Sequence, residues 1–462
     1  MASAEIQRST ASNGNSGKLT VSFWVKRGDV GREQYITTMY YSGAYHGVIY
    51  FSSSDTLNFY DYRNGYIMRK ITNAKFTDCG AWYHVVCNFD HTIGSPTAKI
   101  YVNGVQQSLG TDVNYSQGAT TSWLTDYTHQ IGHFNGGQNF NGILADYYFI
   151  QGYLYEASTF GETDATTGEW KPIIDPTINY SGTGGNSCRL KFEDSSNMDL
   201  DSGSNTVTFT TSGTVTQTQD CPSHNFCTLN PMQRSRVNTN NSGDYLTNAA
   251  TTFDTSSTNG MKAIVNGTIG VQSGKWYWEA KVITNTRMQI GISTGIEQKF
   301  PQPYYDETEY TAITMDASGD VKGRYTGSAI DQFSSSTSNT TNDVLGFALD
   351  MDNKALYIHK NGTYLSNGSN TGVPTSGSSR TGSMIEGLAG SRDDYFPTGE
   401  FMFPVIMDVS TSGVAKVEFN FGNGFFGSTA ISSEGTNASG IGKFEYDVPA
   451  GYTALSTKGL NE

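Results

Sequence analysis

The sequence predicts an all-β protein built from two β-sandwich domains. Its composition holds 52 Gly, 28 Tyr and 24 Phe with only 16% charged residues, and this bias favours strands and tight turns over amphipathic helices. Short strand patterns separated by turn signals recur along the chain, almost without the 3.6-residue periodicity of helices. A length of 462 residues exceeds that of most single domains, so we expect two folding units.

The first predicted domain spans residues 1–192, and the spacing of its strand patterns favours a two-sheet sandwich. Asn103-Gly104 separates an alternating strand from its continuation, and this dipeptide predicts a tight hairpin because both turn positions need a positive φ. One short helix is expected near residues 156–160. The strand patterns are LTVSFWVKR, WYHVVCNFD, AKIYVNGVQ, HQIGHF, GILADYYFIQG and CRLKFED.

A Ser/Thr/Asn-rich connector is predicted over residues 193–225, with one strand at 207–211 inside it. The second sandwich domain is predicted over 226–452, followed by a tail at 453–462. Its strand patterns include GKWYWEAKVI, RMQIGIST, DVLGFALDMD, ALYIHKNG, MFPVIMDV and AKVEFNFG.

Three features of the second domain predict local structure. Trp276 and Trp278 occupy alternate positions of one strand and therefore share a face, which we expect to line the core. Asn361-Gly362 marks another tight turn. Residues 366–399 form a Gly/Ser/Thr-rich insertion that is too long for an ordinary hairpin loop, which indicates a functional or a disordered loop.

Charge and hydropathy limit the partners. Twenty-nine basic residues against 43 acidic ones give a net charge of −14, which disfavours nucleic acid and anionic membranes. The first ten residues lack the apolar core of a signal peptide, and no apolar run approaches the ~20 residues that span a bilayer, so no membrane insertion is expected. Five cysteines without CxxC spacing predict mostly free thiols rather than a disulfide framework or a zinc site. They are Cys79, Cys87, Cys188, Cys221 and Cys227.

Several motifs resemble known recognition domains. In the first half they are Trp24-Val25-Lys26-Arg27, Trp82-Tyr83-His84, Tyr101-Val102-Asn103-Gly104-Val105 and Phe140-Asn141-Gly142. These resemble the core strands and a hairpin of the laminin-G-like, concanavalin A-like sandwich. In the second half, SGKWYWEAKV, IGIST, LGFALDMDNKALYIHKNG, FPVIMDV and FNFG resemble the SPRY domain, a bent sandwich used for protein recognition, and they occur in the expected order.

Linking segments extend the resemblance to nearly the entire chain. FGET with GEWKP, then NFCTLNP, and finally PAGYTAL are similar to the segments that join the same two modules in marine tailed-phage virion proteins. The resemblance implies a virion component made in the host cytoplasm, which also accounts for the missing export signal. The implied partners are other virion proteins, further copies of this chain, with trimers typical of fibres, and a glycan or protein on the host surface.

Glycoside cleavage is the sharpest enzymatic alternative, because concanavalin-like sandwiches also host glucanases. Such chemistry needs two carboxyl groups about 5–10 Å apart. Glu307 and Glu309 offer an i, i+2 pair, yet they follow two prolines in what reads as a loop, so a solvated acidic loop is favoured. Asp350 and Asp352 also alternate, and turn chemistry accounts for them better. No catalytic residues are therefore predicted.

Metal binding is also weighed and not predicted. His129 and His133 are four residues apart, but four strand residues span ~13 Å, too far for both rings to reach one ion. Asp194, Asp199 and Asp201 supply oxygen ligands as a calcium loop would, and Asx turns are the alternative. His84 lies in the WYHVV strand beside an apolar core, which favours a hydrogen-bonded structural residue. No metal and no cofactor are expected.

The candidate contact surface lies in the second domain. Tyrosine offers a flat apolar ring and a hydroxyl at little entropic cost, and arginine adds fork-shaped donors, a pairing that suits glycan or protein surfaces. The candidate residues are Tyr304, Tyr305, Tyr310, Arg392, Asp394 and Tyr395.

The sequence thus predicts a non-enzymatic virion protein, with a fibre or receptor-binding component favoured. The first alternative is a capsid or tail decoration protein that has no host-binding role. The second is a polysaccharide-degrading enzyme carried on the particle.

Overall fold

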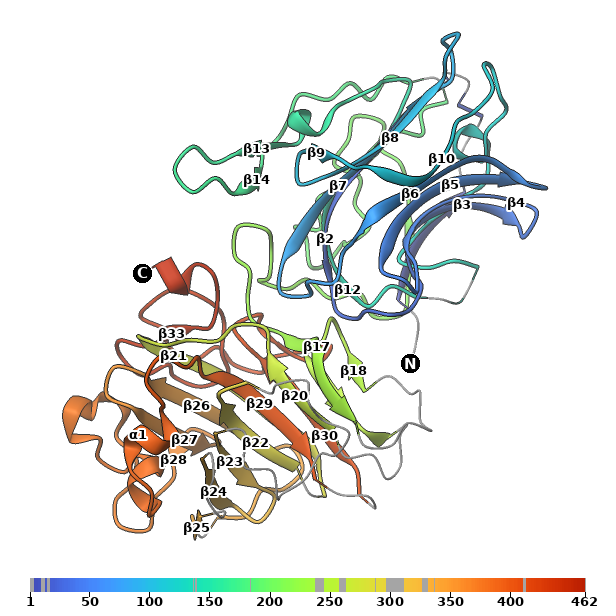
Figure 1. Ribbon diagram of the computed structural model, residues 1–462. Coiled ribbons are helices and arrows are strands. Elements are labelled where there is room, and N and C mark those ends of the chain that lie inside the picture. The colour runs from blue at the N-terminus through green and yellow to red at the C-terminus, as the bar shows by residue number, and fades with distance from the viewer. Residues whose placement is uncertain are drawn as a thin grey trace. The chain divides into compact units, whose positions relative to one another are not determined.

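The structure is a computed structural model, and it divides into two compact β units. It describes residues 4–9, 13–14, 17–135, 137, 139–182, 184–236, 245–256, 263–286, 288–295, 311–325, 331–335, 337–409 and 413–461. The first unit comprises Met1–Gln217 with Cys221–Ser223, and the second comprises Thr218–Asp220 with His224–Glu462 (Figure 1). Most of the predicted connector therefore belongs to the first unit.

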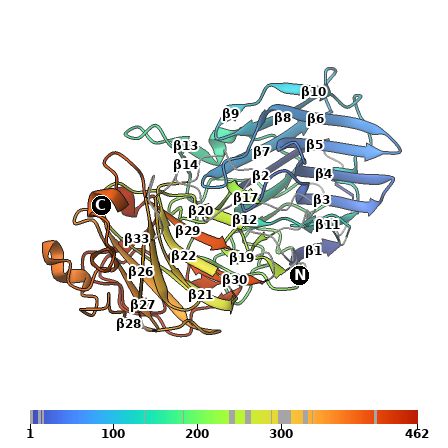
Figure 2. The ribbon, with the colours of Figure 1, turned by 60° about the horizontal axis from the view of Figure 1, so that its bottom comes forward.

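Two antiparallel sheets form the first unit. Figure 2 shows the long strands β3 to β6 of the larger sheet side by side. The larger sheet has the order β10 (Leu109–Val113), β6 (Tyr66–Lys75), β5 (Thr56–Arg63), β4 (Tyr45–Phe51), β3 (Gln34–Ser42), β11 (Thr128–Ile131), β1 (Glu5–Ser9) and β16 (Thr210–Ser212). The smaller sheet has the order β15 (Cys188–Leu190), β12 (Gly142–Gln151), β2 (Lys18–Arg27), β7 (Trp82–Asp90), β8 (Thr97–Val102) and β9 (Val105–Gln106).

The core of the first unit lies between these sheets. Phe23 of β2, Phe59 of β5 and Trp123 are fully buried in it. The Asn103-Gly104 turn joins β8 and β9 with a positive φ at both residues, as predicted. The expected short helix is a 3-10 turn, η2 (Ala157–Thr159). The remaining elements of this unit are η1 (Ser122–Leu124) and the hairpin of β13 (Gly161–Thr163) and β14 (Trp170–Pro172).

The second unit is also a two-sheet sandwich. One sheet has the order β17 (Leu229–Arg236), β20 (Ala263–Gly267), β29 (Phe403–Asp408), β22 (Met288–Ser293), β23 (Ala312–Asp316), β24 (Asp320–Arg324) and β25 (Asp331–Ser334). The other has the order β18 (Leu246–Thr247), β19 (Thr252–Asp254), β30 (Ala415–Asn420), β21 (Lys275–Asn285), β26 (Val344–Asp350), β27 (Ala355–Lys360) and β28 (Thr363–Tyr364), and β33 (Thr453–Ala454) joins β21 in parallel. A small hairpin pairs β31 (Phe425–Phe426) with β32 (Thr429–Ala430).

The structure confirms the prediction that the two strand tryptophans line the core of the second unit. Trp276 and Trp278 are both buried in it, and Trp278 stacks on Phe347 with ring centroids 5.4 Å apart. The Asn361-Gly362 turn has a positive φ at both residues and joins β27 to β28, as predicted.

Residues 366–399 are an integral part of the second unit. Met384, Ile385 and Leu388 from this segment are buried in the main core. The sequence indicated a functional or a disordered loop because Gly, Ser and Thr dominate the segment, but a few apolar residues anchor it. Its short helices are η4 (Pro374–Ser379), η5 (Met384–Gly387) and α1 (Arg392–Tyr395), and η6 (Gly459–Asn461) lies near the end of the chain.

Two further findings concern the described residues. None of their helices is both long and apolar enough to cross a bilayer. None of the five cysteines, all of them among the described residues, forms a disulfide, which agrees with the prediction of mostly free thiols.

Candidate functional site

The outer face of the eight-stranded sheet carries a continuous aromatic surface. Successive side chains of a strand point to opposite faces, and Ile49 and Phe51 of β4, with Leu57 and Phe59 of β5, point into the core. Tyr50 of β4 and Tyr60 of β5, each next to one of these residues, therefore point outward and belong to a separate cluster. We call this cluster the outer aromatic face. Its members are Tyr35, Tyr40, His46, Val48, Tyr50, Tyr60, Tyr62, Tyr66 and Phe134.

Strand pairing brings the rings of this face together. Tyr35 is opposite Tyr50 across β3 and β4, and their rings stack with centroids 4.7 Å apart. Tyr62 is opposite His46 across β5 and β4, and these rings stack at 5.2 Å. Aromatic pairs of this kind contribute about 0.5–1.5 kcal/mol beyond their burial. The rings therefore hold one another in fixed orientations.

The rings of this face differ in solvent exposure. Tyr35 and Tyr60 are buried, whereas Tyr66 keeps 45% of its surface exposed. The Tyr66 ring meets Tyr60 and Tyr62 edge-on at centroid distances of 5.3 and 5.2 Å. The guanidinium carbon of Arg69 lies 4.2 Å from the centroid of Tyr66. The β6 end of the face thus presents a ring and a guanidinium together.

The polar groups of the face are mostly uncharged. Burial, and then the negative charge of Glu33, raises the pKa of Tyr50 to about 12. The same two causes raise the pKa of Tyr35, whose hydroxyl donates to Glu33 Oε2 at 3.2 Å. Burial lowers the pKa of His46. The hydroxyls of Tyr35 and Tyr50 therefore stay protonated near neutral pH, with a carboxylate at the β3 end of the face and a guanidinium at the β6 end.

This arrangement suits a ligand with flat apolar patches and many hydroxyl groups. Rigid aromatic rings offer apolar area at little entropic cost, and their hydroxyls donate or accept hydrogen bonds. A sugar ring has C–H groups on its faces and hydroxyls at its rim. The outer aromatic face therefore has the chemistry of a glycan-binding surface.

The outer face of the smaller sheet is covered instead. Tyr101, Tyr148 and Phe160 are buried there under the segment at 153–180. Trp170 from this segment donates its indole N–H to His84 Nδ1 at 3.0 Å. The side chains of the smaller sheet's own strands, such as Tyr101 and Tyr148, are therefore closed to a bulky ligand.

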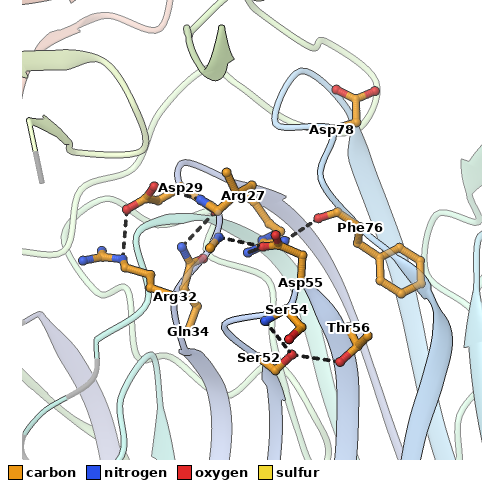
Figure 3. Close-up of polar contacts among 12 residues, drawn as sticks. Arg27, Asp29, Arg32, Gln34, Ser52, Ser54, Asp55, Thr56, Phe76 and Asp78 are labelled. Atoms are coloured by element: carbon orange, nitrogen blue, oxygen red, sulfur yellow. Dashed lines mark hydrogen bonds and ion pairs between the residues drawn. The ribbon is translucent and has the colours of Figure 1, made fainter. Parts of the chain in front are cut away.

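A buried ion-pair network lies at one end of the first sandwich. Arg27, whose side chain is fully buried, donates to Asp55 Oδ1 at 2.9 Å and to the Phe76 carbonyl oxygen (Figure 3). Arg32 pairs with Asp29 at 2.9 Å. The Arg27 guanidinium also lies 4.5 Å from the ring centroid of Phe51.

The carboxylates at this end of the sandwich also accept hydrogen bonds from backbone N–H groups. Asp55 Oδ1 also accepts from the Gly31 N–H at 2.9 Å, and Asp29 Oδ1 accepts from the Val30 N–H at 2.8 Å. Asp78 Oδ1 accepts from the Gly80 N–H of its own turn at 2.8 Å. The contacts of Arg27 tie the β4–β5 turn and the segment after β6 to the end of β2. The network is therefore a structural clamp, with its carboxylates committed to backbone groups and arginines.

The predicted contact residues of the second domain divide into two groups. Tyr304, Tyr305 and Tyr310 lie outside the described residues, as do Glu307 and Glu309 of the enzymatic alternative. Arg392, Asp394 and Tyr395 all lie on α1.

Only part of α1 faces solvent. Arg392 is half exposed and pairs with Glu386 at 3.2 Å. The Asp394 carboxylate accepts from the backbone N–H of Ser391 and completes a capping box. Tyr395 is fully buried and packs against Tyr325. The Tyr395 ring is therefore a core element that a surface ligand does not reach.

The predicted histidine positions are structural. His129 Nδ1 accepts from Arg8 Nε at 3.3 Å, and its Nε2 lies 2.8 Å from the Tyr147 hydroxyl. His133 Nε2 lies 2.9 Å from Glu5 Oε2. The two imidazoles thus have separate partners. Within the described ranges, no group of three or more His, Cys, Asp or Glu side chains is arranged to hold a metal ion.

His84 and the acidic turns follow the structural interpretation. Burial lowers the pKa of His84 to about 3, and Ser22 Oγ lies 2.9 Å from its Nε2. The aspartates of the calcium alternative accept local hydrogen bonds, Asp194 from Ser196 and Asp201 from Gly203. In the second unit, Asp350 accepts from the Asn353 N–H and Asp352 from the Gly274 N–H. Turn chemistry therefore accounts for the local contacts of Asp194, Asp201 and Asp350, whereas Asp352 joins two segments that are far apart in the sequence.

Sequence reasoning missed the outer aromatic face. The available signal was the alternation of Tyr60 with Tyr62, and of His46, Val48 and Tyr50. Alternation assigns each set to one face of its strand, but only the strand register brings the sets together.

Family models match both halves of the chain. A model described as the concanavalin A-like lectin/glucanases superfamily matches residues 2–157, and the SPRY domain model matches residues 275–376. The chain thus contains a concanavalin A-like domain followed by a SPRY domain. The comparison with curated proteins gives no match.

Solved structures show likenesses of fold. The human HERC1 SPRY domain is 16% identical, with 41% of this chain and 96% of that chain covered and a TM-score of 0.26. A heptameric pentraxin of Limulus polyphemus is 20% identical, with 33% and 72% covered and a TM-score of 0.25. Domains LG4-5 of the mouse laminin α1 chain are 9% identical, with 97% and 94% covered and a TM-score of 0.28. Values this low indicate nothing about ligands.

Proposed function

From a concanavalin A-like domain followed by a SPRY domain, we propose a non-catalytic adhesion protein that binds a glycan on the outer aromatic face. Both domains are binding modules, which supports adhesion as the general role. The single observation that carries the glycan proposal is the row of rings from Tyr35 to Tyr66 on the outer face of the larger sheet. Weak single sites of this kind gain avidity when many copies are displayed together.

We further propose that the chain is carried on a virus particle as a fibre or receptor-binding component. The linking segments, such as NFCTLNP at 225–231, support this placement through their resemblance to marine tailed-phage virion proteins. The proposed partners are other virion proteins, further copies of the chain and a host-surface glycan. Capsid or tail decoration is the competing role on the particle.

Binding is favoured over polysaccharide cleavage by the state of the first unit's carboxylates. Hydrolysis needs one protonated and one ionised carboxyl group at the substrate. Asp29 and Asp55, at the end of the sandwich, are both held in ion pairs with arginines. Glu33 is the carboxylate at the outer aromatic face, and it accepts from Tyr35.

The glycan proposal is tested with the full chain on an array of microbial glycans. Wild type should bind a defined set of glycans, and Tyr66→Ala should lose at least about tenfold in affinity for them, since aromatic anchors dominate such contacts. Phe401→Ala is the matched control, because Phe401 is similarly exposed but lies in the second unit. Absence of saturable binding, or equal binding by Tyr66→Ala, would contradict the proposal.

Adsorption separates the two roles on the particle. Purified wild-type chain should compete with particles for host cells, and Tyr66→Ala should not. A chain that leaves adsorption unchanged while its removal weakens the particle supports decoration.

A further inference from the structure

A second group of aromatic residues surrounds an arginine at the end of β5, a strand of the same sheet. The guanidinium carbon of Arg63, the last residue of β5, lies 5.2 Å from the ring centroid of Tyr45 and 5.9 Å from that of Tyr127. Arg63 Nη1 also donates to the Tyr127 hydroxyl at 3.2 Å. These contacts fix the plane of the guanidinium. We call Tyr41, Tyr45, Arg63 and Tyr127 the rim site.

Tyr41 makes the rim site accessible. It keeps 68% of its surface exposed, and its ring stacks on Tyr127 with centroids 5.1 Å apart. Asn64 donates to the Tyr45 hydroxyl at 2.6 Å, which fixes the second ring. An exposed ring therefore lies beside an arginine whose orientation is set by its neighbours.

The guanidinium of Arg63 has N–H groups that are not used in an ion pair. Three other arginines of the first unit, Arg27, Arg32 and Arg189, each pair with an aspartate. Arg63 forms no ion pair with any carboxylate of the described residues, although the chain carries a net charge of −14. Asp61, two residues earlier, is buried and accepts from the Tyr115 hydroxyl and the Ser122 N–H, both at 2.9 Å. The guanidinium therefore retains N–H groups for an external anion.

The rim site is distinct from the outer aromatic face. Tyr62 and Arg63 are consecutive on β5 and so point to opposite faces of the sheet. Tyr62 belongs to the outer cluster, whereas Tyr45 and Tyr127 pack against the sandwich core. A ligand at the rim site does not need the outer face to be occupied.

We propose that the rim site binds a sugar unit that carries a carboxylate, that is, a uronic acid. The planar guanidinium matches a carboxylate through two parallel hydrogen bonds. The exposed Tyr41 ring offers an apolar platform for the sugar ring beside it. The proposal stands on the rim site alone and adds an acidic sugar to the ligands of the chain.

The test measures affinity of the full chain for oligogalacturonate, its methyl ester and a sulfated galactan of equal length. Wild type should prefer oligogalacturonate. Arg63→Gln should weaken that binding by about 10- to 100-fold, because it removes a charge-assisted pair. Arg380→Gln is the matched control, since Arg380 already pairs with Glu386. Urea unfolding of each variant verifies that it is folded.

The outcomes are distinct from those for the outer aromatic face. No uronate binding by wild type, or equal uronate binding by folded Arg63→Gln, overturns the rim proposal. Equal affinity for the ester or the sulfated galactan overturns the assignment to a carboxylate. Tyr41→Ala should weaken oligogalacturonate binding as well. Arg63-dependent binding that survives Tyr66→Ala, with no other glycan bound, supports the rim site while the outer-face proposal fails.

Discussion

The guanidinium of Arg69 lies over the ring of Tyr66, with 4.2 Å between its central carbon and the ring centroid. Arg69 forms no ion pair with a carboxylate of the described residues. A positive group thus sits on the most exposed ring of the outer aromatic face, where it is free to meet a ligand.

Replacing Arg69 should affect binding more than stability. Arg69→Ala is expected to lower the affinity for the array-selected glycan about tenfold, because a guanidinium donor and the support of Tyr66 are lost together. The free energy of unfolding should fall by only about 1 kcal/mol, the size of an exposed cation–π contact. Calorimetric titration and urea unfolding measure the two effects. Arg32→Ala, with its ion pair in the same unit, should keep the affinity, and a loss there as large as in Arg69→Ala would refute the assignment.

Breaking the Arg27 network should destabilise the first unit. Arg27→Met is expected to lower the free energy of unfolding by about 3–5 kcal/mol, because Asp55 and the Phe76 carbonyl lose a buried cationic partner. The double variant Arg27→Met/Asp55→Asn should lose less than the sum of the two single changes, since they remove one shared interaction. Urea unfolding checks this cycle, and strict additivity would contradict the pairing.

Glu279 should make the stability of the second unit depend on pH. Burial raises the pKa of its carboxyl to about 7 even though it accepts from the N–H groups of Glu445 and Tyr446. The folded state therefore favours the protonated form relative to the unfolded chain, whose carboxyl has a pKa near 4.5. This contribution to stability is complete below pH 4.5 and is lost as the pH rises through 7.

The Glu279→Gln variant isolates this effect. Between pH 4.5 and 8, wild type should lose more stability than the variant, by on the order of 3 kcal/mol. Urea unfolding at a series of pH values measures the difference. Glu445→Gln, in the segment that Glu279 contacts, should give a curve parallel to wild type. If the free energy of unfolding of wild type and of Glu279→Gln changes with pH in the same way, Glu279 is not the source of the pH dependence.

The insertion at 366–399 should behave as part of the core. Leu388→Ala is expected to lower the free energy of unfolding by about 2–5 kcal/mol because it removes buried apolar volume. Arg392→Ala, which removes a solvent-exposed ion pair with Glu386, should cost less than about 1 kcal/mol. Tryptophan fluorescence during unfolding distinguishes the two variants. If Leu388→Ala is no less stable than Arg392→Ala, the segment does not anchor this unit.

The fold was predictable where local chemistry is decisive. Asn103-Gly104 and Asn361-Gly362 predicted tight turns correctly, because few residue pairs tolerate two successive positive φ angles. Trp276 and Trp278 predicted a core strand correctly, because alternate residues of a strand share one face. These signals need no knowledge of distant residues.

The binding surface needed information that local patterns lack. Tyr35, Tyr50 and Tyr60 become neighbours only through the register of three strands, and the register shift between Tyr35 and Thr37 changes which residues face outward. The sequence predicts Tyr395 as a contact residue because a tyrosine ring beside Arg392 suits a binding surface, yet Tyr395 is buried in the second core. Burial depends on packing partners far along the chain.

A structure of the full chain with the tightest-binding glycan from the array decides whether the outer aromatic face holds a glycan. Sugar density is expected over β4, β5 and β6, in contact with Tyr62, Tyr66 and Arg69. A glycan bound to the second unit, with that face left empty, would contradict the proposal.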